Sequence, residues 1–378
     1  MLFHVTMTVQ IPHDVDPEKI AQLNAQEHER AKELQLQGKW LHLWRLAGKW
    51  ANVSIFRVES PDELHEILSS LPLYPFMEIE VSALSQHPGA LERVFEMSGS
   101  ADTGLSALQF KAIDGLQIRF AASEKKDGVP ILLLSPWPES IYAFLPTWDT
   151  FSSLGSVVAV DLPGFGRSQS RPDVMAPEAM GEFVLRILDA FGLRQPHVVA
   201  PDVGTPAVLF ASANHPGALK SMVIGSGATD HTDIGGILDE LVNSPSLEPY
   251  KNLTGEEFVR GATENMKKYK LPDYALQDYL ASYSGARFSE SVEFVRDYPK
   301  SLPRLARRLA EVKVPCQITV GRHDPFVPVS NAEGLHKRLP KSKLDILDCG
   351  HFAWEDAAAE YGKIASDWIQ GGYAKLEA

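Results

Sequence analysis

Hydrophobic and polar positions alternate with different periods along the chain, and the change of period divides it into two parts. At the start, Leu2–Val9 alternates apolar and polar side chains, the period-two pattern of a half-buried strand. The first part is expected to hold, in order, a strand at 2–9, a helix at 17–37, strands at 40–47 and 51–58, a helix at 60–70 and a strand at 76–84. This β-α-β-β-α-β order predicts a ferredoxin-like α+β domain over residues 1–90.

From residue 108 onward, short apolar runs alternate with helical segments. The runs lie at 129–135, 156–160, 196–200, 221–225, 316–321 and 343–347. Such runs are typical of a mainly parallel sheet covered on both faces, so residues 108–378 are predicted to form an α/β domain. Between about 229 and 305 the alternation stops in a polar, tyrosine-rich segment with helical spacing, which we interpret as an inserted cap. The Gly-, Ser- and Ala-rich stretch 91–107 is the predicted linker.

Composition and charge narrow the classes of partner. Hydrophobic residues make up 44% of the 378 residues, and the net charge is -13. An acidic globular chain of this kind argues against nucleic acid or an anionic membrane surface as partner. Two distant cysteines form neither a disulfide framework nor a zinc-ligand pattern, and no apolar run is long enough to span a bilayer. We therefore expect a cytoplasmic protein that needs no metal or other cofactor.

The segment 198–210, VVAPDVGTPAVLF, carries the most informative motif. A strand runs into Ala200-Pro201-Asp202-Val203-Gly204 and then into a helix, the small-x-nucleophile-x-small pattern of a nucleophile elbow. Asp202 occupies the place where serine is usual. Taken alone, an Asp after a strand is more often a helix cap.

Two later residues stand where an acid and a base are needed. Asp324 follows a strand in Gly-Arg-His-Asp-Pro, and His351 follows the last strand in Asp-Cys-Gly-His-Phe. The chain order nucleophile, acid, histidine is that of α/β-hydrolases. Although each motif also has a structural explanation, their shared order favours a catalytic set of Asp202, Asp324 and His351.

Two upstream runs make a family resemblance visible. They are Leu-Ser-Pro-Trp-Pro-Glu-Ser at 134–140 and Asp-Leu-Pro-Gly-Phe-Gly-Arg-Ser at 161–168. With them, residues 108–378 resemble α/β-hydrolases, especially the epoxide hydrolase and dehalogenase branch that uses an Asp nucleophile. The chain departs from that branch in having Ser135-Pro136 where His-Gly is usual, and Val203 where Trp often follows the nucleophile.

The resemblance implies roles for residues around Asp202. Asp202 would attack an electrophilic carbon and form an enzyme ester, and His351, oriented by Asp324, would activate the water that hydrolyses it. The backbone N–H groups of Trp137 and Val203 are the candidate oxyanion donors. Cap tyrosines are candidates to polarise an epoxide or lactone oxygen, although most such tyrosines simply pack; they are Tyr279, Tyr283 and Tyr298.

The first 88 residues resemble muconolactone Δ-isomerases over nearly their full length. The resemblance rests on MLFHV at the start, Glu27, Gln37-Gly38-Lys39-Trp40, His42-Leu43-Trp44-Arg45, Ala51-Asn52, Ser54-Ile55-Phe56, Glu63-Leu64-His65 and Leu71-Pro72-Leu73. It implies a ferredoxin-like fold, homo-oligomers with sites near subunit interfaces, and proton transfer in a small anionic lactone. That chemistry needs a base and a cation for the substrate carboxylate. The candidate site residues are Glu27, His28, Lys39, His42 and Arg45, and we expect Trp40 and Trp44 to share one strand face.

Joining the two resemblances gives the leading hypothesis. Muconolactone isomerisation yields an enol-lactone, which an α/β-hydrolase opens next in aromatic catabolism. We therefore expect a bifunctional isomerase and hydrolase acting on a small acidic lactone. The alternative is an epoxide hydrolase or dehalogenase whose N-terminal domain serves for homo-oligomerisation. A third possibility is a non-enzymatic binding protein on a decayed hydrolase fold.

Overall fold

The computed structural model describes residues 1–12, 14–36, 39–85, 105, 108–123, 128–246 and 252–376. The chain divides into two compact units, Met1–Ser98 and Gly99–Ala378, which are described separately below. The stretch predicted as linker, 91–107, lies outside the described residues except for Leu105.

In its described residues, the first unit is an antiparallel sheet with two α-helices. Its elements are β1 (Leu2–Val9), α1 (Pro17–Leu36), β2 (Trp40–Arg45), β3 (Ala51–Arg57), α2 (Pro61–Ser69) and β4 (Met77–Leu84). The strands are ordered β2-β3-β1-β4, with β1 in the middle between β3 and β4. Phe3, Val5 and Met7 of β1 are buried in one core with residues of both helices, as the period-two pattern predicts. The ferredoxin-like arrangement expected from the sequence is confirmed.

One irregularity in β2 changes which side chains share a face. The register with β3 shifts between Trp40 and His42, the mark of a β-bulge. Trp40 is therefore buried against Phe56, with ring centroids 4.7 Å apart. Trp44 is 53% exposed and stacks on His42 instead. The expectation that Trp40 and Trp44 share a face is wrong, because the extra residue reverses the alternation.

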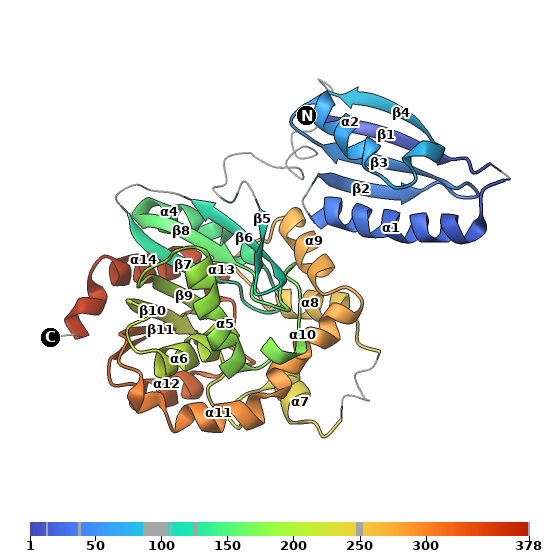
Figure 1. Ribbon diagram of the computed structural model, residues 1–378. Helices are drawn as coiled ribbons and strands as arrows, with labels where there is room; N and C mark the ends of the chain where they lie inside the picture. The colour runs from blue at the N-terminus through green and yellow to red at the C-terminus, as the bar shows by residue number, and fades with distance from the viewer. Residues whose placement is uncertain are drawn as a thin grey trace. The chain divides into compact units, whose positions relative to one another are not determined.

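The second unit is built on a mostly parallel sheet (Figure 1). Its strands are β5 (Gln109–Ile113), β6 (Leu116–Ser123), β7 (Val129–Leu134), β8 (Gly155–Val160), β9 (His197–Pro201), β10 (Ser221–Gly225), β11 (Cys316–Gly321) and β12 (Ser342–Leu347). Their spatial order is β12-β11-β10-β9-β7-β8-β6-β5. Strands β7 to β12 pair in parallel, and β5 and β6 add an antiparallel edge.

Helices cover both faces of this sheet, as Figure 1 shows. They are α4 (Trp148–Leu154), α5 (Pro177–Ala190), α6 (Gly204–Asn214), α12 (Val329–Arg338), α13 (Ala353–Asp356) and α14 (Ala358–Ile369). Alternate residues of β7 enter opposite cores: Leu132 and Leu134 pack on one side, and Ile131 and Leu133 on the other. Burial on both faces explains why the strands appear in the sequence as continuous apolar runs.

Within the described residues, five α-helices are inserted between β10 and β11. They gather at one end of the sheet (Figure 1). They are α7 (Gly236–Asn243), α8 (Gly255–Thr263), α9 (Asp273–Ser282), α10 (Ala286–Arg296) and α11 (Tyr298–Ala306). We call this insertion the cap. Across the described ranges, no helix combines the length and apolar character needed to cross a bilayer.

Candidate active site

Asp202 lies on the sharp turn between β9 and α6. Its backbone has a φ of +51°, a left-handed conformation that a residue with a side chain rarely adopts. Its N–H donates to the carbonyl oxygen of Gly225 at 3.0 Å, and its own carbonyl accepts from Thr205 at 2.9 Å. A Cβ on Gly227 would lie only 2.1 Å from the Asp202 carbonyl oxygen, so the turn requires a glycine there. This strained geometry is that of a nucleophile elbow.

The predicted acid and histidine lie next to Asp202. Nδ1 of His351 is 2.8 Å from Oδ2 of Asp324, and its Nε2 is 3.7 Å from Oδ1 of Asp202. The other Asp324 oxygen accepts the backbone N–H groups of Phe326 and Val327, both at 2.9 Å. Asp324 is thereby fixed from two sides and fixes the imidazole in turn. The three residues have the spatial arrangement of a catalytic triad.

The two carboxylates control the charge of His351. Burial alone disfavours the imidazolium, but the charges and hydrogen bonds of Asp324 and Asp202 outweigh it and raise the pKa of His351 to about 10. The histidine is therefore protonated at neutral pH. An imidazolium between two carboxylates can donate a proton. It can act as a base only after one of the two carboxylates has lost its negative charge, because that loss lowers the pKa of the imidazole.

The backbone N–H of Trp137 points at the nucleophile. It donates to Oδ2 of Asp202 at 2.7 Å. The indole N–H of Trp137 donates instead to Oγ of Ser291 on α10, at 3.0 Å, and the ring packs on Phe258 with centroids 4.7 Å apart. Val203, the other predicted donor, is buried and precedes α6 directly after Asp202. The amide of Trp137 is thus placed to stabilise negative charge on an Asp202 oxygen.

A narrow cavity of about 30 Å³ opens beside Asp202 and His351. Apart from these two residues its lining is apolar or aromatic, and it comprises Trp137, Pro138, Ala228, Ile237, Leu238, Phe258, Ala262, Val295, Tyr298, Phe326 and Phe352. This lining contains no lysine or arginine. The part of a substrate that enters the cavity must therefore be small and uncharged, because an unpaired charge would lose its hydration there.

The three predicted cap tyrosines have different positions. Tyr298 lines the cavity, where burial and then the charge of Asp202 raise the pKa of its hydroxyl. Tyr279 does not line it, because its hydroxyl donates to Oε1 of Glu355 at 3.1 Å. Tyr283 also lies elsewhere, since its hydroxyl donates to the carbonyl oxygen of Glu139 at 2.8 Å. The structure therefore leaves Tyr298 alone as a candidate contact to substrate.

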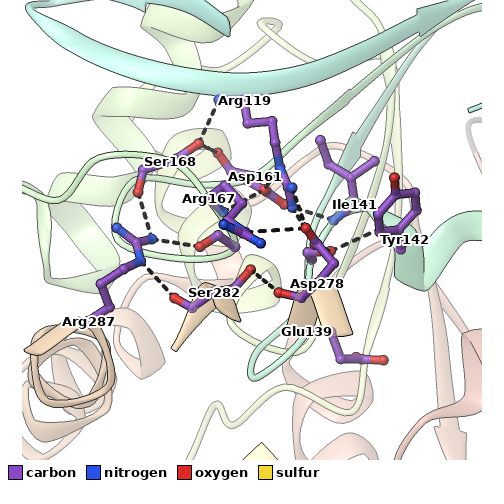
Figure 2. Close-up of polar contacts among 12 residues, drawn as sticks. Arg119, Glu139, Ile141, Tyr142, Asp161, Arg167, Ser168, Asp278, Ser282 and Arg287 are labelled. Atoms are coloured by element: carbon purple, nitrogen blue, oxygen red, sulfur yellow. Dashed lines mark hydrogen bonds and ion pairs between the residues drawn. The ribbon is translucent and has the colours of Figure 1, made fainter. Parts of the chain in front are cut away.

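A buried ion-pair network, which the sequence did not reveal, joins the cap to the sheet (Figure 2). Arg119 of β6 is only 4% exposed; it bonds Asp161 at 2.5 Å and both oxygens of Asp278 on α9 at 2.8 Å. The hydroxyl of Ser140 donates to the same Asp278 at 2.6 Å. Arg287 of α10 adds bonds to carbonyls of the 161–168 loop. The network fixes the cap helices relative to the turn that carries Trp137.

The first unit has a cavity of its own, of about 290 Å³. It is lined by Val9, Asn24, Glu27, His28, Ala31, Trp40, Leu43, Arg45, Trp50, Ala51, Asn52, Leu73 and Met77. Three of the five predicted residues thus come together, namely Glu27, His28 and Arg45. Burial raises the pKa of Glu27, although a backbone N–H of Leu73 donates to it at 2.9 Å and partly offsets the effect.

The other two predicted residues lie outside this cavity. Lys39 forms an ion pair with Glu63 at 2.8 Å. The bulge turns His42 to the opposite sheet face from Trp40. The sequence reasoning also missed Asn24, whose position three residues before Glu27 on α1 places it on the same helix face.

The sheet order, the strained elbow and the triad together define the class: this unit is an α/β-hydrolase with a carboxylate at the nucleophile position. Comparison with family models agrees, since residues 129–358 match the model for the alpha/beta hydrolase fold and residues 1–90 match that for Muconolactone delta-isomerase. The chain belongs to the alpha/beta hydrolase fold family and carries an N-terminal domain of the muconolactone delta-isomerase family.

Individual relatives resemble each unit separately. A muconolactone Delta-isomerase of Acinetobacter lwoffii is 52% identical over 91 residues, which are 24% of this chain and 95% of that protein. A 2-hydroxy-6-oxononadienedioate/2-hydroxy-6-oxononatrienedioate hydrolase of Burkholderia vietnamiensis is 25% identical over 281 residues, covering 68% of this chain and 93% of the relative.

Solved structures resemble the hydrolase unit. An enol-lactonase of Burkholderia xenovorans has a TM-score of 0.56 at 14% identity, covering 69% of this chain and 99% of its own. A haloalkane dehalogenase of Bradyrhizobium elkani has a TM-score of 0.61 at 19% identity, covering 71% and 99%. At these identities the likeness shows the shared fold alone.

Proposed function

We propose that the chain is a bifunctional enzyme of aromatic-compound breakdown, which isomerises a muconolactone-type lactone in its first unit and hydrolyses a lactone in its second. The isomerase half is supported by the 52% identity of the first unit to a muconolactone Delta-isomerase. The hydrolase half is carried by one observation, the Asp202 carboxylate that accepts from the Trp137 amide beside His351. The domain pair supports a common substrate class, because the product of the isomerisation is itself a lactone.

In the first unit, Glu27 is the proposed base. A carboxylate whose pKa is raised by burial both takes a proton from carbon more readily and returns it. Arg45 lines the same cavity and supplies a cation for the substrate carboxylate. His28 lies one residue from Glu27, with Nδ1 2.7 Å from the carbonyl oxygen of Asn24. Proton abstraction and return by Glu27 move the double bond without any other reagent.

In the second unit, Oδ1 of Asp202 is the proposed attacking atom. Its partner oxygen, Oδ2, is held by Trp137, which leaves Oδ1 between the cavity and Nε2 of His351. Attack forms a bond from Oδ1 to the lactone carbonyl carbon and breaks the bond between that carbon and the ring oxygen, so that the acyl group is held on Asp202 as a mixed anhydride. The protonated His351 supplies the proton that the departing oxygen needs.

The same step prepares His351 for the second half of the reaction. Anhydride formation removes the charge of Asp202, which is one of the two that raise the pKa of His351. His351 has also given up its proton and is now a neutral base oriented by Asp324. It takes a proton from water, the resulting hydroxide cleaves the anhydride, the ring-opened acid is released, and Asp202 regains its charge.

The cavity limits how a lactone binds. Since no lysine or arginine lines it and His351 is already paired with Asp202 and Asp324, the ring enters and any carboxylate on the substrate must point out of it. Tyr298 is the proposed hydrogen-bond donor to the ring oxygen.

An oxygen-labelling experiment tests the role of Asp202. The full-length enzyme is allowed a single turnover in heavy-oxygen water, and the peptide containing Asp202 is analysed by mass spectrometry. Label in Asp202 is expected when hydroxide attacks the Asp202 carboxyl carbon of the enzyme anhydride. An unlabelled Asp202, together with undiminished lactone turnover in Asp202→Asn, would rule out the nucleophilic role.

A second candidate function is hydrolysis of an epoxide or a carbon–halogen bond, with the first unit used for homo-oligomerisation. The carboxylate at the elbow and the apolar cavity favour it. Exposed apolar side chains on the first unit favour oligomerisation, and they include Leu43, Trp44, Trp50, Val81 and Leu84. Turnover of a matched panel of lactones, epoxides and haloalkanes separates the two functions. Sedimentation of Trp44→Lys beside the unaltered protein tests the interface.

A further inference from the structure

Two buried glutamates behind the hydrolase site have no role in the chemistry described so far. Glu139 follows the turn that carries Trp137, and Glu355 lies in α13, four residues after His351. Their exposed fractions are 0% and 2%. Neither forms a salt bridge within the described residues. Two carboxylates buried side by side without a cation cannot both stay charged.

Each of the two glutamates has one carboxylate oxygen with a hydrogen-bond partner and one without. Oε2 of Glu139 accepts the indole N–H of Trp354 at 3.1 Å, and Oε1 of Glu355 accepts the hydroxyl of Tyr279 at 3.1 Å. The remaining oxygens, Oε1 of Glu139 and Oε2 of Glu355, have no other partner among the residues described. The two side chains are within hydrogen-bonding distance of each other. One proton between them would satisfy both oxygens at once.

The pair also connects the parts of the hydrolase site. The backbone carbonyl of Glu139 accepts the Tyr283 hydroxyl from the cap, and Trp137, two residues earlier, donates to Asp202. Trp354 contacts His351, with ring centroids 5.7 Å apart. A bond between Glu139 and Glu355 therefore ties the Trp137 turn to the loop of His351.

We propose that Glu139 and Glu355 share one proton, which Glu139 holds and donates to Glu355, and that this bond makes both of them positioning residues for hydrolysis. Neither touches the cavity, so they act through Trp137 and His351. The positioning role rests on the proposed function of Asp202, whereas the shared proton does not.

The surroundings favour this protonation state at neutral pH. Burial raises the pKa of Glu355 to about 7 and that of Glu139 well above its usual range, and the charge of Glu355 raises the latter further. The other titratable groups that face the pair are Asp202, Asp356, Tyr269 and Tyr279. Above pH 7 Glu139 thus remains the donor and Glu355 the charged acceptor, while below it the pair takes up a second proton.

Infrared spectroscopy tests the shared proton without any substrate. The full-length protein at pH 8 should show the carbonyl stretch of a protonated carboxyl group, and this band should disappear in Glu139→Gln. Glu360→Gln, which changes an exposed glutamate of α14, is the matched control and should keep the band. A spectrum in which Glu139→Gln loses no such band would overturn the shared proton, whatever the role of Asp202.

Kinetics test the positioning role. A glutamine at position 139 can still accept from Trp354 and donate to Glu355, so Glu139→Gln should keep kcat within about 3-fold of the unaltered enzyme. Leucine can do neither, so Glu139→Leu should lower kcat by about 100-fold, the effect of a lost oxyanion donor. KM should change little in both variants. The acid limb of the kcat profile near pH 7 should stay in place in Glu139→Gln and move to higher pH in Glu139→Leu, because charged Glu355 loses its donor only in the Leu variant. Equal kcat in the Gln and Leu variants, or an acid limb at the same pH in both, would show that Glu139 and Glu355 have only a structural role.

Discussion

The backbone N–H of Trp137 donates to Oδ2 of Asp202 at 2.7 Å, so the proposed oxyanion donor is already engaged by the proposed nucleophile. Only a carboxylate can accept this hydrogen bond and still act as a nucleophile, because its second oxygen remains free to react. A serine at the same elbow would leave the Trp137 amide without its partner. The contact explains in physical terms why an Asp can replace a Ser at this position.

The first prediction concerns this contact. Asp202→Asn keeps an oxygen for the Trp137 amide but has no nucleophilic charge, so hydrolysis should fall by about 10⁴-fold, as for loss of a catalytic nucleophile. Asp202→Ser should be similarly impaired, since its single oxygen cannot serve both functions. Steady-state turnover with circular dichroism as a folding control measures both. Activity within 10-fold of the unaltered enzyme, an effect of only about 1.4 kcal/mol, would contradict the assignment.

The second prediction concerns the charge of His351. Its pKa is raised from 6.5 to about 10 in the folded protein. The imidazolium therefore stabilises the fold fully below pH 6.5, and this contribution is lost as the pH rises through 10. In Asp202→Asn the pKa should fall, because one of the two neighbouring charges is gone. Histidine NMR titration of both proteins measures the change, and an unchanged pKa would mean that Asp202 does not control His351.

The third prediction separates the two units. Glu27→Gln removes the proposed base and should lower isomerisation by about 10²- to 10⁴-fold, while hydrolysis stays unchanged. Asp202→Asn should give the reverse pattern. Glu29→Gln, an exposed neighbour on α1, is the matched control. Retained isomerisation in Glu27→Gln would exclude Glu27 as the base.

The fourth prediction concerns the cap. Arg119→Met removes the buried cation that Asp161 and Asp278 share and leaves Asp278 only the partly exposed Arg167 at 3.3 Å, which should cost about 3–5 kcal/mol in the free energy of unfolding. Arg186→Met, at an exposed ion pair with Asp114, should cost about 1 kcal/mol or less. Denaturant unfolding of the two variants provides the comparison. Equal losses would show that the network around Arg119 does not hold the cap.

Short-range signals in the sequence were sufficient to predict both folds and to single out Asp202, Asp324 and His351, which the structure brings together. Asp202 is recognisable because a strained turn demands small neighbours in the sequence itself, and Asp324 and His351 because each follows a strand end in a fixed order. The cap tyrosines were less predictable. Helical spacing does not reveal that Tyr279 and Tyr283 point at Glu355 and Glu139.

Long-range and irregular features could not be predicted. Arg119 and Asp278 are 159 residues apart in the sequence, and the sequence pattern around either residue does not indicate the other as its partner. The bulge after Trp40 leaves no trace in the apolar pattern, yet it removes His42 from the isomerase cavity. Such features arise from the folded backbone rather than from local sequence.

The presence of both compact units in one chain determines the relative amounts in which the two units are made. A cell that makes the hydrolase unit makes an equal number of isomerase units, whatever the level of expression. The ratio of the two activities is therefore set by their turnover rates alone, and only amino-acid substitutions can adjust it. How much intermediate accumulates between the two proposed steps is then an inherited property of the polypeptide.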